Sequence, residues 1–342
     1  MRLFAQDLTT DTLQHIAARG LSEAGGPKPL LLRVLVDLFV RRPTHSDQEI
    51  QHFAEIAYTV LPSATAEEID HAAMRLACHP SAPGDLLDLL ASRAHIGALT
   101  LLAQSRRLAT SVLHVAAAQG SKEAALALAS RDDLDATTLT LLAARQDPEI
   151  HLRLVENRAA PLDDTIITSL VATAPDHPAL AAALTHRLPH HKACWSLFLL
   201  AQRAERLTMI GAAKHQMPAH LPASDTSKNL ADLVTCAQNN ATQFALALSQ
   251  ALSCSGDLAQ EIVNDRGGEP LVLALTALGA DPTTLMMLIS AVQGPLTQGQ
   301  IIWRQALAAT LPRAIAQSIL SAILTARRPS AAQDTDQWRR LA

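Results

Sequence analysis

The chain has 342 residues and is 49% AVILMFWYC but only 3% aromatic, so Ala and Leu must provide most of the core packing. Ala and Leu are the best helix formers, whereas a β-sandwich of this size would need more Val, Ile, Thr and Tyr, so we expect no substantial sheet. The formal charge of −4, from 28 Lys and Arg against 32 Asp and Glu, leaves no excess of cations to neutralise phosphates, which argues against a nucleic acid partner.

The sequence predicts neither a secretion signal nor a membrane span. Asp7 falls where a signal peptide would need its apolar run. The longest uncharged stretches, 233–256 and 282–303, are broken by polar residues, Gly and Pro. The four cysteines form no C-x-x-C pair, and we interpret them as small buried residues in a reducing compartment. These features predict a cytoplasmic protein without membrane insertion.

The first predicted elements are capped helices. An N-terminal segment, 1–28, ends in a Gly-Gly-Pro-Lys joint, and a short apolar helix is predicted at 30–40. Ser46 stands three residues before Glu49, and Thr65 three residues before Glu68, so each pair can satisfy free amides at a helix start. These two capping boxes predict helices near 47–61 and 66–78.

A period of 26 residues then runs through the first half of the chain. Two apolar stripes keep this step, one through Leu76, Leu102, Leu128 and Leu154, the other through Leu87, Leu113 and Leu139. Two stripes per period predict two short helices, and so short a pair must stack on the next pair to bury its apolar face. We therefore expect an all-α fold in which HEAT-like helix pairs over 29–213 form an α-solenoid.

The pattern weakens after the third unit. Thr165 stands where the period predicts leucine, although Ile166 and Ile167 can compensate, and 214–228 is predicted to be the main linker. A smaller C-terminal helical module follows over 229–327, with helices predicted within 241–252, 257–263, 270–278, 282–292, 298–310 and 312–327. The tail, 328–342, carries too little apolar surface to fold by itself.

The period also aligns charged residues. Arg106, Asp132 and Arg158 occupy equivalent positions, and Arg107 is matched by Asp133. Equivalent positions in stacked helices lie about 10 Å apart, a gap that Arg and Asp can nearly close together. The structural interpretation is a ladder of exposed ion pairs, which is favoured because such pairs are common. The functional alternative is that the arginines face a carboxylate-bearing partner.

Histidines and a cysteine crowd together at His177, His186, His190, His191 and Cys194. A metal site needs several N or S donors that converge on one point. Pro189 lies between two of the histidines and makes the helical i, i+4 geometry doubtful, and histidine clusters without a firm spacing are weak signals. A solvated His-rich turn is therefore favoured over a metal site.

The most distinctive string of the second module runs from Asp265 to Leu271, D-R-G-G-E-P-L. Two glycines let the chain reverse, and Glu269 and Pro270 suit the first turn of a helix. A corner between two helices is the favoured interpretation, and a functional loop stays open because short charged turns often carry binding residues. The chain holds no phosphate loop, no G-x-S-x-G elbow and no H-E-x-x-H, so we do not expect an enzyme.

The helix-pair units, the string 265–271 with its following helix and the Asp281-Pro282 turn resemble an alphaproteobacterial family of HEAT-like repeat proteins, a DUF2336-like domain of unknown function. The resemblance spans about residues 30–295 and is strongest at 268–271. It implies a helical-repeat fold in a bacterial cytoplasm, and it carries over no activity.

The function expected from these observations is a non-enzymatic protein-interaction scaffold or regulatory adaptor, because stacked repeats expose long continuous faces. The partner is expected to be a protein, no cofactor is predicted, and the sequence leaves open a homo-oligomer. The alternative is a small-ligand or metal sensor that uses the His177–Cys194 region, and an enzyme without a recognisable motif ranks last. The candidate partner-binding residues are Arg106, Arg107, Arg131, Arg158, Asp265 and Glu269.

Overall fold

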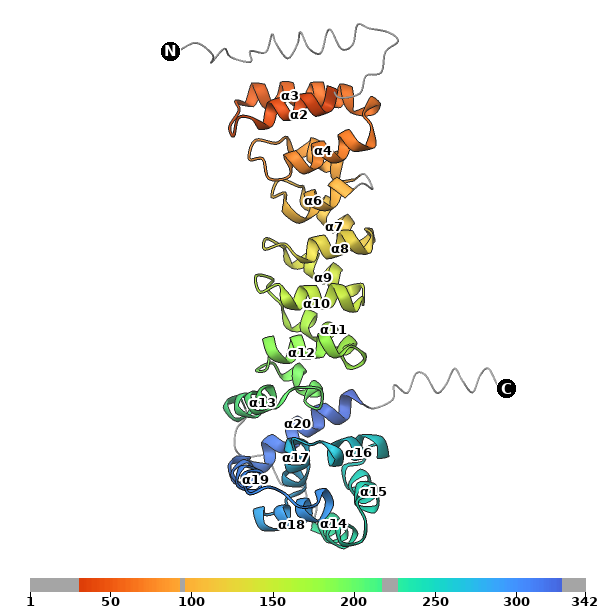
Figure 1. Ribbon diagram of the computed structural model, residues 1–342, viewed down its shortest axis with the longest axis vertical. Coiled ribbons are helices and arrows are strands. Elements are labelled where there is room, and N and C mark those ends of the chain that lie inside the picture. The colour runs from red at the N-terminus through yellow and green to blue at the C-terminus, as the bar shows by residue number, and fades with distance from the viewer. Residues whose placement is uncertain (1–30, 93–95, 217–226, 328–342) are drawn as a thin grey trace, which may run out of the picture. The chain divides into compact units, whose positions relative to one another are not determined.

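The computed structural model of the chain describes residues 31–92, 96–216 and 227–327. Throughout these ranges the regular elements are α-helices and short 3-10 helices, and none is a strand (Figure 1). The all-α fold class is therefore confirmed. The predicted N-terminal segment 1–28, the tail 328–342 and most of the predicted linker 214–228 lie outside the described residues.

The chain divides into two compact units, residues 1–166 and residues 167–342, which we call unit 1 and unit 2. The division falls within helix α11 (Asp164–Thr173) and not at the linker expected near 214–228. The reason lies in tertiary packing. The 3-10 helix η3 (Lys192–Leu197) and helix α13 (Arg203–Gln216) pack on helix α20 (Arg313–Ala326), near the C-terminal end of the described chain.

Unit 1 is a stack of short helices in chain order (Figure 1). One row contains α2, α4, α6, α8 and α10, each in contact with the next, and α7 contacts α9 in a second row. The helices are α2 (Leu31–Val40), α3 (Asp47–Val60), η1 (Leu61–Ser63), α4 (Ala66–Leu76), α5 (Gly84–Ala91), α6 (Ile96–Gln104), α7 (Thr110–Gln119), α8 (Lys122–Ala129), α9 (Ala136–Ala144) and α10 (Pro148–Glu156).

The helix bounds follow the predicted step of 26 residues. Helices α6, α8 and α10 begin at 96, 122 and 148, and α5, α7 and α9 begin at 84, 110 and 136. The leucines that carry the period are all buried, with no more than 8% of each exposed: Leu76, Leu87, Leu102, Leu113, Leu128, Leu139 and Leu154. The helical arrangement is thus consistent with the predicted solenoid, in which a pair buries its apolar face only against its neighbours.

The structure also contains the local features that the sequence predicts. Both predicted capping boxes form, since Ser46 and Thr65 each accept a hydrogen bond from the glutamate amide three residues on and donate their own amide to its carboxylate. At the irregular fourth unit Thr165 is exposed, and Ile166 and Ile167 are 2% exposed and take over the apolar position, as expected.

Unit 2 is built around one fully buried helix. All ten residues of α17 (Glu269–Leu278) are buried, which is typical of a helix that is apolar all round. Helices α14, α16, α18, α19 and α20 all contact it. The remaining helices of the unit are η2 (Ala174–Asp176), α12 (Pro178–Arg187), α14 (Ser227–Asn239), α15 (Ala241–Leu252), α16 (Gly256–Asn264), α18 (Pro282–Gln293) and α19 (Gln298–Thr310).

Helix length and apolar character were compared with what a bilayer requires. Within the described ranges no single helix is both long and apolar enough to cross a membrane, and only α19 and α20 together, bent by 100°, reach that length and composition.

Candidate functional site

Of the ion pairs predicted for the charge ladder, the described residues form one, between Arg106 and Asp132. Arg106 Nη2 lies 2.9 Å from Asp132 Oδ2, and both side chains are mostly exposed. Arg158 is exposed and makes no ion pair with Asp132, whereas Arg107 Nη1 donates to the Pro80 carbonyl oxygen at 2.8 Å. The arginines of the ladder therefore differ: Arg106 is bound to its neighbour, and Arg158 presents its guanidinium to solvent.

Arg131 is placed quite differently from its prediction as a partner-binding residue. Only 4% of it is exposed. Its Nε and Nη2 donate to the two carboxylate oxygens of Asp133, each at 2.7 Å, and its Nη1 donates to the Leu102 carbonyl oxygen at 2.8 Å. A guanidinium with these bonds in the interior cannot meet a partner, so its role is to join one helix pair to the preceding one.

Other side chains make the same backward connection. Asn157, one period after Arg131, donates from Nδ2 to the carbonyl oxygens of Ala129 and Arg131. Arg145 donates to the Ala117 carbonyl oxygen at 3.4 Å. These carbonyls lie at helix ends, where they lack partners within their own helix, so the side chains satisfy them across the stack. The signal available in the sequence was a polar residue recurring at 105, 131 and 157 next to the leucine stripe.

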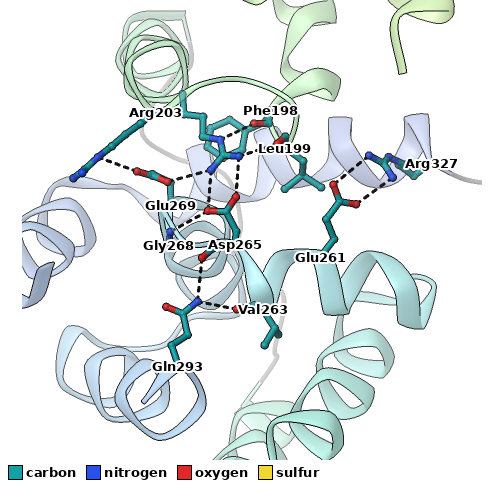
Figure 2. Close-up of polar contacts among 11 residues, drawn as sticks. Phe198, Leu199, Arg203, Glu261, Val263, Asp265, Gly268, Glu269, Gln293 and Arg327 are labelled. Atoms are coloured by element: carbon teal, nitrogen blue, oxygen red, sulfur yellow. Dashed lines mark hydrogen bonds and ion pairs between the residues drawn. The ribbon is translucent and has the colours of Figure 1, made fainter. Parts of the chain in front are cut away.

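In unit 2, Asp265 and Glu269 converge on one arginine (Figure 2). Arg206 lies on α13. Its Nη1 is 2.9 Å from Asp265 Oδ1 and its Nη2 is 2.9 Å from Asp265 Oδ2, while Nη1 is also 3.2 Å from Glu269 Oε2. Its Nε and Nη2 also donate to the carbonyl oxygens of Phe198 and Leu199, at 3.0 and 2.8 Å. Every nitrogen of this guanidinium is therefore bound, 7% of Arg206 being exposed.

Two more arginines complete what we call the Arg206 network: Arg203, Arg206, Asp265, Glu269 and Arg304. Arg203 Nε lies 3.1 Å from Glu269 Oε1, and its guanidinium lies 4.0 Å from the ring centroid of Trp303. Arg304 is 2% exposed, and burial lowers its pKa, against the opposing effect of the two carboxylates. Arg206, Arg304 and Glu269 are thus buried, whereas the side chain of Arg203 is 56% exposed and closes the network at the surface.

The glycines of the string are needed by this network. Gly268 has φ +85°, and a Cβ there would lie 2.6 Å from the Arg304 guanidinium. A Cβ on Gly267 would collide with the Glu269 carboxylate. A shift of Arg304 would disturb the hydrogen bond that its Nη1 donates to Gln293 Oε1 at 2.8 Å, while Gln293 Nε2 donates to the Val263 carbonyl oxygen at the end of α16. The string is a helix corner shaped by buried charge.

Glu269 is 0% exposed, and so cannot serve as the partner-binding residue predicted from the sequence. The side chain of Asp265 is 19% exposed and already carries the Arg206 pair. Sequence analysis missed Arg203, Arg206 and Arg304 because nothing in their local spacing relates them to a turn that is about 60 residues away for Arg206.

The five donors of the His177–Cys194 region do not converge. Among the described residues no three His, Cys, Asp or Glu side chains are placed to hold a metal ion. His186 Nδ1 lies 3.6 Å from Glu205, and His191 Nδ1 accepts from the Ala193 amide at the start of η3. Burial raises the pKa of the Cys194 thiol to about 12, which disfavours the thiolate that metals bind.

An apolar groove in unit 1 is the best candidate for a binding surface. It has a volume of about 780 Å³ and is lined by the end of α5, by α6 and α7 and by the start of α8, and we call it the α7 groove. Ile96 and Val115 line it and are 75% and 60% exposed. Ile96 has the highest value among the large apolar side chains that the structure describes as exposed, and Val115 shares the second with Ile302 of α19. Large exposed apolar residues in one hollow are typical of interaction sites.

Comparison with protein families gives one match. Residues 98–213 match DUF2336. This family is described as an uncharacterised protein conserved in bacteria, and the match covers 116 of the 342 residues. It confirms the central part of the resemblance, while 30–97 and 214–295, including the string at 268–271, lie outside it. No curated protein and no solved structure matched the chain.

The DUF2336 segment begins in α6 and ends in α13. It contains most of the residues that line the α7 groove, on α6, α7 and α8, and it contains Arg203 and Arg206. Asp265 and Glu269 lie outside it. The segment therefore includes most of the groove but only part of the Arg206 network.

Proposed function

We propose that this chain is a non-enzymatic protein-interaction scaffold of the α-solenoid type, with HEAT-like helix pairs, that acts as a regulatory adaptor in the bacterial cytoplasm. The observation that carries the proposal is the α7 groove with its exposed Ile96 and Val115. Apolar side chains in such a hollow gain free energy when a partner removes them from water.

Further observations support this function. The helix stack of unit 1 presents successive similar surfaces, as scaffolds do. All four cysteines are free, which fits a reducing compartment. Most charged side chains of the candidate set are bound to other parts of the chain, so the proposal places recognition on apolar surface and not on the arginine ladder.

The test is site-specific photo-crosslinking in the producing bacterium. A crosslinking phenylalanine analogue at Val115 reports on the groove, and the same analogue at Val34 is the matched control, since Val34 is a 45% exposed valine on α2 away from the groove. We expect one dominant protein captured at position 115 and absent at position 34, and the purified protein should bind the purified chain. If both positions capture the same chaperones, or nothing, the scaffold function is refuted.

A further inference from the structure

We propose that the α7 groove binds a basic amphipathic helix of a partner protein. This inference rests on the proposed function and adds the chemical class of the partner.

The shape of the groove fits a helix. On α7 its lining runs from Ser111 to Gln119, a length of about 12 Å or two helical turns. An amphipathic helix that presents apolar anchors at i, i+3, i+4 and i+7 covers about the same length. Ala98, Ala116 and Ala124 also line the groove, and such small side chains allow a third helix axis to approach closely.

The apolar contacts account for one face of the partner. Val112 and Leu99 line the groove together with the exposed Ile96 and Val115. A partner that filled only part of the groove would leave Ile96 or Val115 exposed to water, so the partner segment must be long enough to cover both side chains. Large apolar side chains such as Leu are therefore expected on the buried face of the partner helix.

The charge accounts for the other face. Among the described residues of the lining Glu123 is the only charged one, and the neighbouring Lys122 forms its ion pairs with Asp147 and Glu149. Hydrogen bonds from its own amide and from Ser121 lower its pKa, so it is ionised at neutral pH. Residues 31–166 carry 18 Asp and Glu against 12 Lys and Arg, a formal charge of −6. An acidic unit with an exposed carboxylate at its groove favours a partner with Lys or Arg beside its apolar face.

Two positions of the groove become charged one period later. One period later, Ile96 is replaced by Lys122, which pairs with Asp147 and Glu149 at 3.4 and 2.9 Å. The residue equivalent to Gln119 is Arg145, which donates to the Ala117 carbonyl oxygen. Val115 is matched by Leu141, so the two units differ at the positions of Ile96 and Gln119, where the next unit places side chains that are bound within the chain.

The test uses the full chain and a fluorescein-labelled model peptide of about 14 residues, with Leu at i, i+3, i+4 and i+7 and Lys at the other positions. Binding is followed by anisotropy at about 0.15 M salt. Two control peptides separate the contributions: one has Glu in place of Lys on the same apolar face, and the other has the same Leu and Lys in an order without an apolar face. We expect saturable 1:1 binding of the first peptide and at least about tenfold weaker binding of both controls.

Variants of the chain locate the binding. Val115→Asp should weaken the Leu/Lys peptide by about tenfold or more, although the added negative charge would by itself attract lysines. Met74→Asp is the matched control, because Met74 is a 50% exposed apolar residue of unit 1 outside the groove, and it should leave binding unchanged. Glu123→Gln should weaken binding about twofold to tenfold and flatten its salt dependence.

Several results would overturn the inference. Equal binding of the Leu/Lys and Leu/Glu peptides would show that the partner need not be basic. Unchanged binding of the Leu/Lys peptide to Val115→Asp would show that the peptide does not bind in the groove. If the chain is a dimer that Val115→Asp converts to a monomer in sedimentation, the occupant is a second copy. A protein crosslinked at position 115 that lacks a basic amphipathic helix would refute this inference and leave the proposed scaffold function intact.

Discussion

Arg206 binds two carboxylates and two carbonyl oxygens with all three of its guanidinium nitrogens, and this network decides the behaviour of single residues in unit 2. The two carboxylates of this network differ in burial, and therefore in what their loss costs in stability. Glu269 is fully buried between Arg203 and Arg206, whereas Asp265 keeps a share of solvent. Removal of a buried partner leaves uncompensated charge, which costs more than the pair itself is worth.

Glu269→Gln should therefore lower the free energy of unfolding by about 3–5 kcal/mol, because the buried Arg206 and Arg304 would be left with Asp265 as their only carboxylate in the network. Urea unfolding followed by circular dichroism measures the change. Glu261→Gln is the control, since Glu261 pairs with Arg327 at 3.2 Å on the surface of the same unit, and its loss should cost about 0–1 kcal/mol. Equal effects of the two substitutions would contradict the buried network.

Gly268→Ala tests the close approach of Arg304. It should destabilise the protein by about 1–3 kcal/mol, because the new Cβ meets a guanidinium fixed by Gln293 and the backbone stays at positive φ. Gly279→Ala is the control with a matched backbone, since Gly279 has φ +89°. A Cβ there would lie 3.0 Å from the guanidinium of Arg313, which is half-buried. The difference between the two unfolding free energies therefore measures how much more the contact with Arg304 costs than the contact with Arg313, and a difference near zero would show that Arg304 does not account for the loss.

At the scale of elements, the joints between helix pairs combine apolar stripes with hydrogen bonds from side chains to the preceding pair. Two arginines in neighbouring joints show the contrast. Arg131 is buried and bonded in three directions, and Arg106 is exposed and bonded to one aspartate. The equal periodic spacing of such residues does not reveal which is structural, because burial depends on the packing of the stack.

Arg131→Met preserves side-chain length and removes these bonds, so we expect a loss of about 2–3 kcal/mol in the free energy of unfolding. Arg106→Met should change it by at most about 1 kcal/mol, since the Arg106–Asp132 pair is solvated. Both proteins can be compared by thermal and urea unfolding. A larger loss for Arg106→Met would mean that the exposed ladder, and not the buried joint, holds the pairs together.

The start of α18 gives a prediction for pH. A hydrogen bond from the Thr284 side chain, with backbone bonds, lowers the pKa of Asp281, which caps this helix. A carboxylate with a lowered folded-state pKa contributes stability that is present above its ordinary pKa of 3.8, and this contribution is lost as the pH falls below 3.8 and through the folded-state pKa. Asp281→Asn keeps the cap acceptor, so stability near neutral pH should change little.

The decrease in unfolding free energy between about pH 5 and pH 3 should then be smaller for Asp281→Asn than for the unsubstituted chain. Urea unfolding at a series of pH values gives both slopes. The difference between the two curves is the relevant quantity, because other carboxylates titrate in both proteins. Parallel curves would show that folding does not lower the pKa of Asp281.

At the scale of the whole molecule, the extent of the DUF2336 match and the extent of the compact units do not coincide. The match spans 98–213, and the units divide at 166. A fragment of residues 98–213 would lose α4 and α5, which pack on α6, and it would lose α20, which packs on α13 and η3. It would also leave Arg206 without Asp265 and Glu269.

We therefore expect the fragment 98–213 to unfold without cooperativity, whereas the full chain should show a sharp transition. Thermal scans followed by circular dichroism, together with amide hydrogen exchange of α13, would measure this. A fragment that unfolds as sharply as the full chain, with α13 protected, would show that the matched segment is an independent domain.

What the sequence determined by itself is local or periodic: the helical class, the 26-residue step, the capping boxes and the substitution of Ile166 and Ile167 for leucine. These features follow from contacts within one helix or from one apolar face repeated along the chain. The tertiary structure alone decided that Arg131 and Glu269 are buried, that Arg206 reaches a turn about 60 residues away, and that apolar surface is left open beside α7. Such pairings depend on how separate helices come together, which spacing along the chain does not encode.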